Sequence, residues 1–180
     1  MNTGKISTRY ALALYSLSKE QGVEEEVYVQ MYALGEAMIA FPKLQQALSS
    51  PMFSVKDKMA LLKTASGGSP CALLEQFFDF VLSKRRESFI LFMSMSYQDL
   101  YRKDKDIVVA KVTTAVDLQE NTLEKVKSLV TRLSKSKDVL LRTEVKKDII
   151  GGYVLELNNY RIDASVKTKL NEIEKHLTEE

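Results

Sequence analysis

Few residues of this chain have the types and spacing that catalysis or metal binding requires. The single histidine, His176, has no second histidine or nearby cysteine with which to share a metal ion. It ends an apolar-periodic segment, where a helix dipole favours a cation. The single cysteine, Cys71, begins an apolar segment, where cysteine is typically a small hydrophobic side chain. We therefore expect no catalytic residue, no metal site and no cofactor.

Two glycine pairs and one Asp-x-Ser sequence raise the question of a phosphate site or a catalytic pair. Gly67-Gly68 and Gly151-Gly152 lack the Gly-x-x-x-x-Gly-Lys-Ser/Thr and Gly-x-Gly-x-x-Gly spacings that aim backbone N–H groups at a phosphate. Adjacent glycines more often form a bulge or a tight turn. Asp163 and Ser165 stand just ahead of an apolar-periodic segment, a position that favours a helix N-cap at Asp163 over a catalytic role.

The first part of the chain reads as helical throughout. Apolar residues recur at steps of three and four up to about Lys103, and Gly22, Pro42, Pro51 and Gly67-Gly68 interrupt them. The predicted helices span residues 3–21, 27–41, 44–48, 55–66, 71–83 and 87–103. Six helices joined by short turns predict a bundle over residues 1–105.

The remaining residues, 106–180, change to mixed character. A β-branched run at 107–115 predicts a strand, and Asp117 with Glu120 resembles a capping box that opens a helix. Alternation at 139–145 and 153–157 predicts two more strands, with Asn158-Asn159 as a hairpin turn into a fourth. A last helix carries Val166, Leu170, Ile173 and Leu177. The expected fold is mostly α: a six-helix bundle followed by a small α/β domain.

Charge and composition exclude several classes of function. The net charge is +2, and residues 1–104 hold 12 basic and 11 acidic side chains, so neither part has the bias typical of nucleic-acid binding. No apolar run approaches the ~20 residues of a membrane span. The N-terminus has no apolar signal segment, and one cysteine suits a reducing compartment. We expect a soluble, intracellular chain.

Some of the predicted helices carry more apolar surface than burial of one side requires. The helix at 71–83 is apolar over about 200° of its circumference, whereas one-sided burial needs little more than ~100°. The helix at 3–21 has a similar surplus, because Ala11, Leu12 and Tyr15 lie outside its main stripe. That stripe consists of Ile6, Tyr10, Ala13, Leu14 and Leu17. Either both helices are central in the bundle and wrapped by neighbours, or together they line an external groove for an amphipathic helix of another protein. The helix at 87–103 is also apolar on most sides, and periodicity does not decide which helix is exposed.

Four sequence pieces, in order, resemble the F-type ATP synthase delta subunit family, which includes the mitochondrial oligomycin-sensitivity conferral protein. They are Thr8-Arg9-Tyr10-Ala11-x-Ala13-Leu14-Tyr15, the segment Phe77 to Glu87, Val112 to Leu118, and Ile150-Gly151-Gly152 with Ile162-Asp163-x-Ser165-Val166. Two departures are Ala164, where the family usually has glycine, and Val145-Lys-Lys-Asp148, where it usually has Asp-Pro-Ser.

The resemblance implies a non-catalytic stator subunit in a hetero-oligomeric complex, present as a monomer. By this resemblance, the six-helix domain binds N-terminal helical segments of the alpha subunits through Tyr10, Leu14, Leu73, Phe77, Phe80 and Val81. The C-terminal domain meets the b subunits of the peripheral stalk, and Gly151, Gly152, Asp163 and Ser165 form the family signature there. The implied location is the cytoplasmic face of a bacterial inner membrane, peripheral to it.

Two other classes of function compete with this interpretation. A nucleic-acid-binding adaptor would use basic residues of the C-terminal domain, namely Lys135, Lys137, Lys146, Lys147, Lys167 and Lys169, and its affinity would fall steeply with salt. A small transferase or hydrolase would need an active site, and the sequence offers none.

Overall fold

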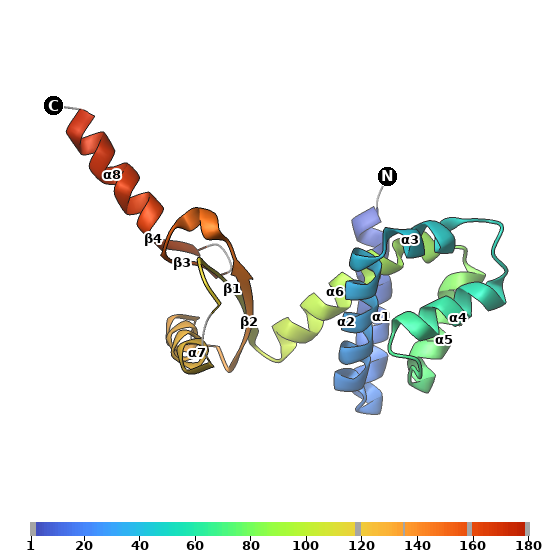
Figure 1. The fold of residues 1–180 in the computed structure, drawn as a ribbon. Helices are drawn as coiled ribbons and strands as arrows, with labels where there is room; N and C mark the ends of the chain where they lie inside the picture. Colours follow the sequence, from blue (N-terminus) through green and yellow to red (C-terminus); the bar gives the residue numbers. More distant parts are fainter. Residues whose placement is uncertain (1–2, 118–119, 135, 158–159, 179–180) are drawn as a thin grey trace. The chain divides into compact units, whose positions relative to one another are not determined.

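The computed structural model describes residues 3–117, 120–134, 136–157 and 160–178, and Figure 1 labels its elements. The helices are α1 (Thr3–Gln21), α2 (Glu24–Ala40), α3 (Pro42–Ser49), α4 (Val55–Ala65), α5 (Ala72–Ser83), η1 (Glu87–Phe89), α6 (Ile90–Asp104), α7 (Glu120–Ser134), η2 (Lys147–Ile149) and α8 (Val166–Thr178). The strands are β1 (Ile107–Thr114), β2 (Asp138–Val145), β3 (Gly152–Leu157) and β4 (Tyr160–Ser165). The mostly helical fold with a small α/β part is confirmed.

Local chemistry explains where the first helices begin and end. Gly22 follows α1 with a φ of +70°, which glycine adopts without steric penalty. Pro42 occupies the first turn of α3, where its missing N–H is not needed. Ser54 and Asp57 form a capping box at the start of α4. The third helix is longer than the short turn predicted at 44–48, because Pro42 starts it rather than only bounding it.

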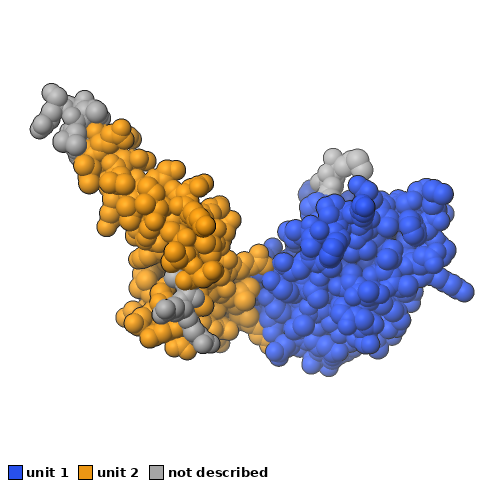
Figure 2. Space-filling view, viewed as in Figure 1, with its two compact units in different colours: residues 1–102 blue, residues 103–180 orange. Residues whose placement is uncertain are grey.

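The chain divides into two compact units, which Figure 2 colours separately. Unit 1 comprises Met1–Arg102 and unit 2 comprises Lys103–Glu180. The division falls inside the last turn of α6, three residues before the boundary drawn from the sequence. The predicted capping box depends on the side chain of Glu120, which is not among the side chains that the structure describes, and the predicted turn at Asn158-Asn159 lies outside the described residues.

Unit 1 has a polar and aromatic contact at the centre of α1, α2 and α6. Tyr97 of α6 is fully buried, and its hydroxyl donates to the Glu24 carbonyl oxygen at 3.1 Å and shares a 2.8 Å hydrogen bond with Ser18 Oγ. The Tyr15 ring meets the Tyr97 ring edge-on. Burial raises the pKa of Tyr97 to about 12. These contacts hold α6 against the side of α1 that carries Tyr15 and Ser18, whereas Tyr10, on another side of α1, stacks on Phe80 of α5.

Unit 2 is a four-stranded sheet in the order β2-β1-β3-β4. β1 pairs in parallel with β2, and α7 is the crossover that a parallel pair requires. β1 with β3, and β3 with β4, pair antiparallel. The core side chains lie on one face of the sheet with Val130 of α7: Ala110, Val112, Val139, Leu155 and Leu157. This core is small, and no side chain of α8 that the structure describes belongs to it.

Candidate functional site: an apolar groove between two helices

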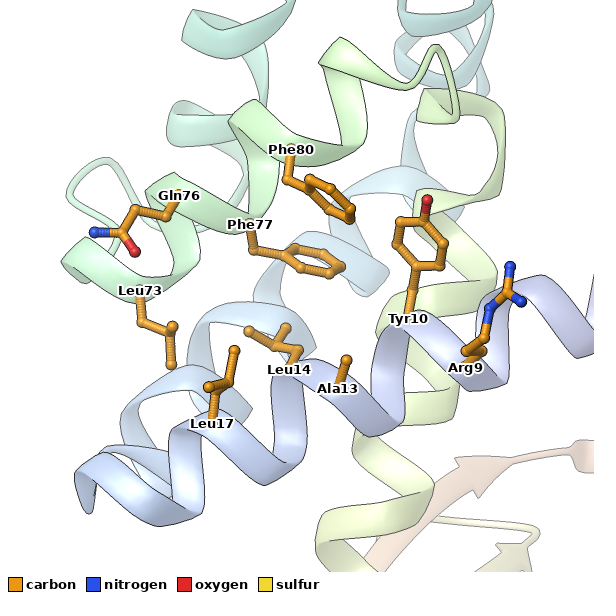
Figure 3. A pocket seen from close by; sticks show the side chains of 9 residues that line it. All are labelled: Arg9, Tyr10, Ala13, Leu14, Leu17, Leu73, Gln76, Phe77 and Phe80. Carbon is orange, nitrogen blue, oxygen red and sulfur yellow. The ribbon is translucent and has the colours of Figure 1, made fainter.

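A groove with a volume of about 420 Å³ lies between α1 and α5. From α1 it is lined by Arg9, Tyr10, Ala13, Leu14 and Leu17, and from α5 by Leu73, Gln76, Phe77 and Phe80. Figure 3 shows the apolar and aromatic side chains of this set lying between the two helices, whereas Gln76 extends to one side. The lining is almost entirely apolar, so the groove can bind an apolar side of another helix but holds no group for catalysis.

The apolar excess of α5 is divided between the core and the groove. Leu74, Phe78 and Val81 are completely buried in the bundle, which accounts for one part of the wide arc. Phe80 lies on the other part and is 50% exposed. Both interpretations offered by the sequence therefore apply to α5, because its inner arc is wrapped by neighbours and its outer arc lines a groove.

The structure corrects the assignment of sides on α1. Ala11 and Tyr15, which the sequence placed outside the main stripe, are buried, whereas Ala13 and Leu17 of that stripe are exposed along the groove. The reason is the packing of α6, because its buried Tyr97 draws Tyr15 inward. Leu12 is exposed, and it lies outside the groove lining.

Five of the six residues that the sequence singled out for partner binding line one groove: Tyr10, Leu14, Leu73, Phe77 and Phe80. Val81 does not, because it is 0% exposed and faces the bundle core; the sequence prediction for Val81 is wrong. Arg9, Ala13, Leu17 and Gln76 were missed. Ala13 and Leu17 are apolar and recur at helical spacing, so the sequence could have identified them. Arg9 and Gln76 are polar and have no such pattern.

Aromatic and cationic side chains close one end of the groove. The Tyr10 and Phe80 rings stack with their centroids 5.6 Å apart. Arg86 donates to the Tyr10 hydroxyl at 3.0 Å, with its guanidinium carbon 5.2 Å from the centre of that ring. Lys84 Nζ stands 5.8 Å from the centre of the Phe80 ring. Lys84 and Arg86 thus stand against two aromatic rings that line the groove, although neither cation is itself a lining residue.

The glycine pair of unit 2 is a tight backbone junction. Gly152 has a φ of +76°, and a Cβ there would collide with the Ala164 carbonyl oxygen across the β3–β4 pair. A Cβ at Gly151 would come within 3.1 Å of Val166 Cγ2, at the start of α8. Glycine at 152 is required by both its φ and the close approach of β4. Ala164 itself is ordinary strand, so alanine in place of the family's glycine meets no positive φ there.

Ser165, and not Asp163, caps the last helix. The Thr168 N–H donates to Ser165 Oγ at 3.2 Å, which is the N-cap geometry for a helix beginning at Val166. Asp163 lies in β4, and its Oδ1 accepts the Ser165 N–H at 3.0 Å. Hydrogen bonds from Ser165 hold the pKa of Asp163 below its usual value. The N-cap prediction for Asp163 is therefore wrong by two residues, because β4 continues to Ser165.

Helix α8 presents its apolar side to solvent. Val166, Leu170 and Ile173 are 38%, 50% and 56% exposed, at the spacing of one helix face. The side chain of His176 lies outside the described residues. Beyond its first turn, α8 thus shows an apolar stripe that nothing described in unit 2 buries.

Three further features of the described residues concern possible chemistry. Within residues 3–117, 120–134, 136–157 and 160–178, no group of three or more His, Cys, Asp or Glu side chains is placed to hold a metal ion. Cys71 is half-buried at the N-cap of α5. No helix in these ranges combines the length and apolarity needed to cross a membrane.

Comparison with known proteins gives a consistent result. Residues 6–177 match the sequence model of the family described as ATP synthase delta (OSCP) subunit. Curated relatives include ATP synthase subunit delta of Phocaeicola vulgatus, 37% identical over 96% of this chain and 94% of the relative, and that of Parabacteroides distasonis, 39% identical over 99% of each. A chain in the cryo-EM structure of the Toxoplasma gondii mitochondrial ATP synthase hexamer aligns over 96% of this chain and 97% of its own length, with a TM-score of 0.70. At 19% identity that likeness concerns the fold alone.

Proposed function

This chain belongs to the ATP synthase delta (OSCP) subunit family, and we propose that it holds the catalytic head of the synthase through its α1/α5 groove. It is a non-catalytic stator subunit, a part of the peripheral stalk. The occupant of the groove is an N-terminal helical segment of an alpha subunit. The observation that carries this proposal is the open, apolar lining between α1 and α5, with the Phe80 ring half exposed in it.

A stator works by binding and not by reacting. Rotation driven by ions would turn the head together with the rotor unless a tether to the membrane sector resisted the torque. The tether must dissociate slowly, which requires well-packed apolar anchors more than fast encounter. Phe77, Phe80 and Leu17 are such anchors, because an amphipathic helix presents side chains at i, i+3, i+4 and i+7 to a groove of this kind.

A second contact follows from the same role. We propose that unit 2 binds the b subunits of the peripheral stalk and that α8 supplies the contact with Val166, Leu170 and Ile173. A helix of 13 residues that packs on little is only marginally stable in water. Burial of its apolar stripe by a partner helix would stabilise it. One interface at each unit allows two contacts to act together, which raises the overall affinity without enlarging either one.

Location follows from these partners. A chain that joins the head to the stalk lies at the cytoplasmic face of a bacterial inner membrane and is peripheral to it. It enters the complex as a monomer, because each of its two surfaces is assigned to a different subunit.

The nucleic-acid alternative gains no support. Of the six lysines that this alternative would use, Lys146 is paired with Glu144 at 3.2 Å, and two other cations of unit 2 are also paired: Lys111 with Glu144 at 2.9 Å and Lys127 with Asp138 at 3.2 Å. Hydrogen bonds from Lys111 and Lys146 also lower the pKa of Glu144, so the carboxylate stays charged. Paired cations have less to gain from a phosphate backbone.

The test of the groove is binding of a synthetic alpha-subunit N-terminal peptide to the full chain by isothermal titration calorimetry. Phe80→Asp places a charge at the mouth of the groove and should weaken binding by about 100-fold, the effect of losing a central aromatic anchor. The matched control is Phe92→Asp on α6, because Phe92 is 48% exposed and lies outside the groove lining. Equal affinities for the two variants would reject the groove as the binding site.

A further inference from the structure

The two ends of the α1/α5 groove differ in charge. At the end closed by Tyr10 and Phe80, three cations gather: Arg9 in the lining, Arg86 on Tyr10 and Lys84 over Phe80. Figure 3 shows Arg9 beside Tyr10, with Leu17 and Leu73 at the other end. This asymmetry is separate from the apolar lining and is not needed for apolar binding.

The other end of the groove is uncharged or acidic. Gln76 lines it with Leu17 and Leu73. Glu20 is exposed and follows Leu17 by three residues, which places it on the same side of α1. Arg9 and Glu20 are eleven positions apart on one helix, roughly 16 Å at 1.5 Å per residue. A helix of four to five turns lying in the groove would reach both ends.

Stabilisation of α5 alone does not explain the cationic end. Lys84 and Arg86 follow the C-terminus of α5, where cations offset the helix dipole. That dipole is equivalent to roughly half a negative charge, and Arg9 belongs to a different helix. Asp79 is the exposed carboxylate next to Phe80, and it leaves the cations in excess.

We propose that the groove sets the direction of its occupant by charge. It takes an amphipathic helix whose carboxylates lie beside Arg9, Lys84 and Arg86 and whose opposite end lies near Glu20. The inference rests on the proposed function of the groove as the alpha-subunit site. The spacing of apolar anchors at i, i+3, i+4 and i+7 is nearly the same in both directions along a helix. Apolar contacts alone therefore do not fix the direction in which the occupant helix lies. Charges placed at one end do orient it, and they also speed encounter.

The test uses the full chain and a synthetic peptide of the first 25 residues of the alpha subunit of the same synthase. The double variant Arg9→Glu with Lys84→Glu should weaken peptide binding about tenfold at low salt, and the loss should shrink as salt screens the charges. The matched control is Lys43→Glu with Lys56→Glu, which changes the net charge equally at exposed positions outside the groove. A nitroxide on the more acidic end of the peptide should broaden the amide NMR signals of residues around Arg9 and Lys84, and a nitroxide on the other end those around Glu20.

Several results would overturn the inference while leaving the proposed function in place. The double variant could bind as tightly as the wild type while Phe80→Asp still prevents binding, or the peptide could lie in the opposite direction. Sedimentation equilibrium tests the proposed function separately, because a dimer of the chain that Phe80→Asp dissociates would make a second copy the occupant and would overturn the assignment of the groove to an alpha subunit. If Phe80→Asp itself changes nothing, the proposed function fails.

Discussion

Helices α1 and α8 are both amphipathic, and they differ in how much of their apolar side the chain covers. Leu14 of α1 is 2% exposed, because α5 and the bundle core lie against it, whereas Leu170 of α8 is 50% exposed. Unit 1 completes its own core and leaves a groove at the margin. Unit 2 completes a smaller core with α7 and leaves Val166, Leu170 and Ile173 of α8 exposed. One unit thus offers a preformed site, and the other offers a helix that a partner must stabilise.

The largest expected effect separates these two helices directly. Leu14→Ala should lower the free energy of unfolding by about 2–5 kcal/mol, because it removes buried methyl groups and leaves a cavity. Leu170→Ala should change the free energy of unfolding by no more than about 0.5 kcal/mol but should weaken binding to a b-subunit fragment. Urea denaturation of the full chain measures the first quantity, and calorimetry with the fragment measures the second. Equal destabilisation by both substitutions would mean that the chain covers α8 itself.

Two glycines sharpen the comparison between the units. Gly152→Ala in unit 2 combines a positive φ with a collision against the Ala164 carbonyl oxygen, and should destabilise that unit by about 2–4 kcal/mol. Gly67→Ala in unit 1 meets a φ of +109° but open space, and should cost about 1–2 kcal/mol. Hydrogen exchange followed residue by residue locates each loss. A Gly152→Ala loss that spread equally into unit 1 would show that the two units do not unfold separately.

A pH dependence confined to unit 1 is the last expected difference between the units, and it appears only in alkaline solution. The folded-state pKa of Tyr97 is about 12, above the ordinary 10.0, because burial disfavours the phenolate. The stability from this group is therefore complete below pH 10 and is lost as the pH rises toward 12. Between pH 9.5 and 11.5 the wild type should lose about 2 kcal/mol more than Tyr97→Phe. Parallel urea titrations of the two proteins measure the difference, and identical pH profiles would contradict the assigned pKa.

The sequence predicted the order of elements well because periodicity, glycines and prolines are local signals. It could not choose the sides of α1, since the burial of Tyr15 depends on Tyr97, 82 positions along the chain. Val81 was misassigned for the same reason, because a wheel gives the width of an apolar arc but not which part faces a neighbour. The roles of Lys84 and Arg86 were missed, because they depend on a ring contact between residues of α1 and α5.

The direct passage from β4 into α8 has a mechanical consequence. β4 ends at Ser165 and α8 begins at Val166, with the Ser165 cap at the joint. A force applied to α8 is therefore transmitted directly to β4, because no flexible linker between them can extend. The force is then borne by the antiparallel pairing of β3 with β4, which runs from Gly152–Ser165 to Leu157–Tyr160. These strands belong to the sheet that carries the unit 2 core. Traction along a strand strains many such hydrogen bonds at once, so this joint resists extension as a stiff coupling.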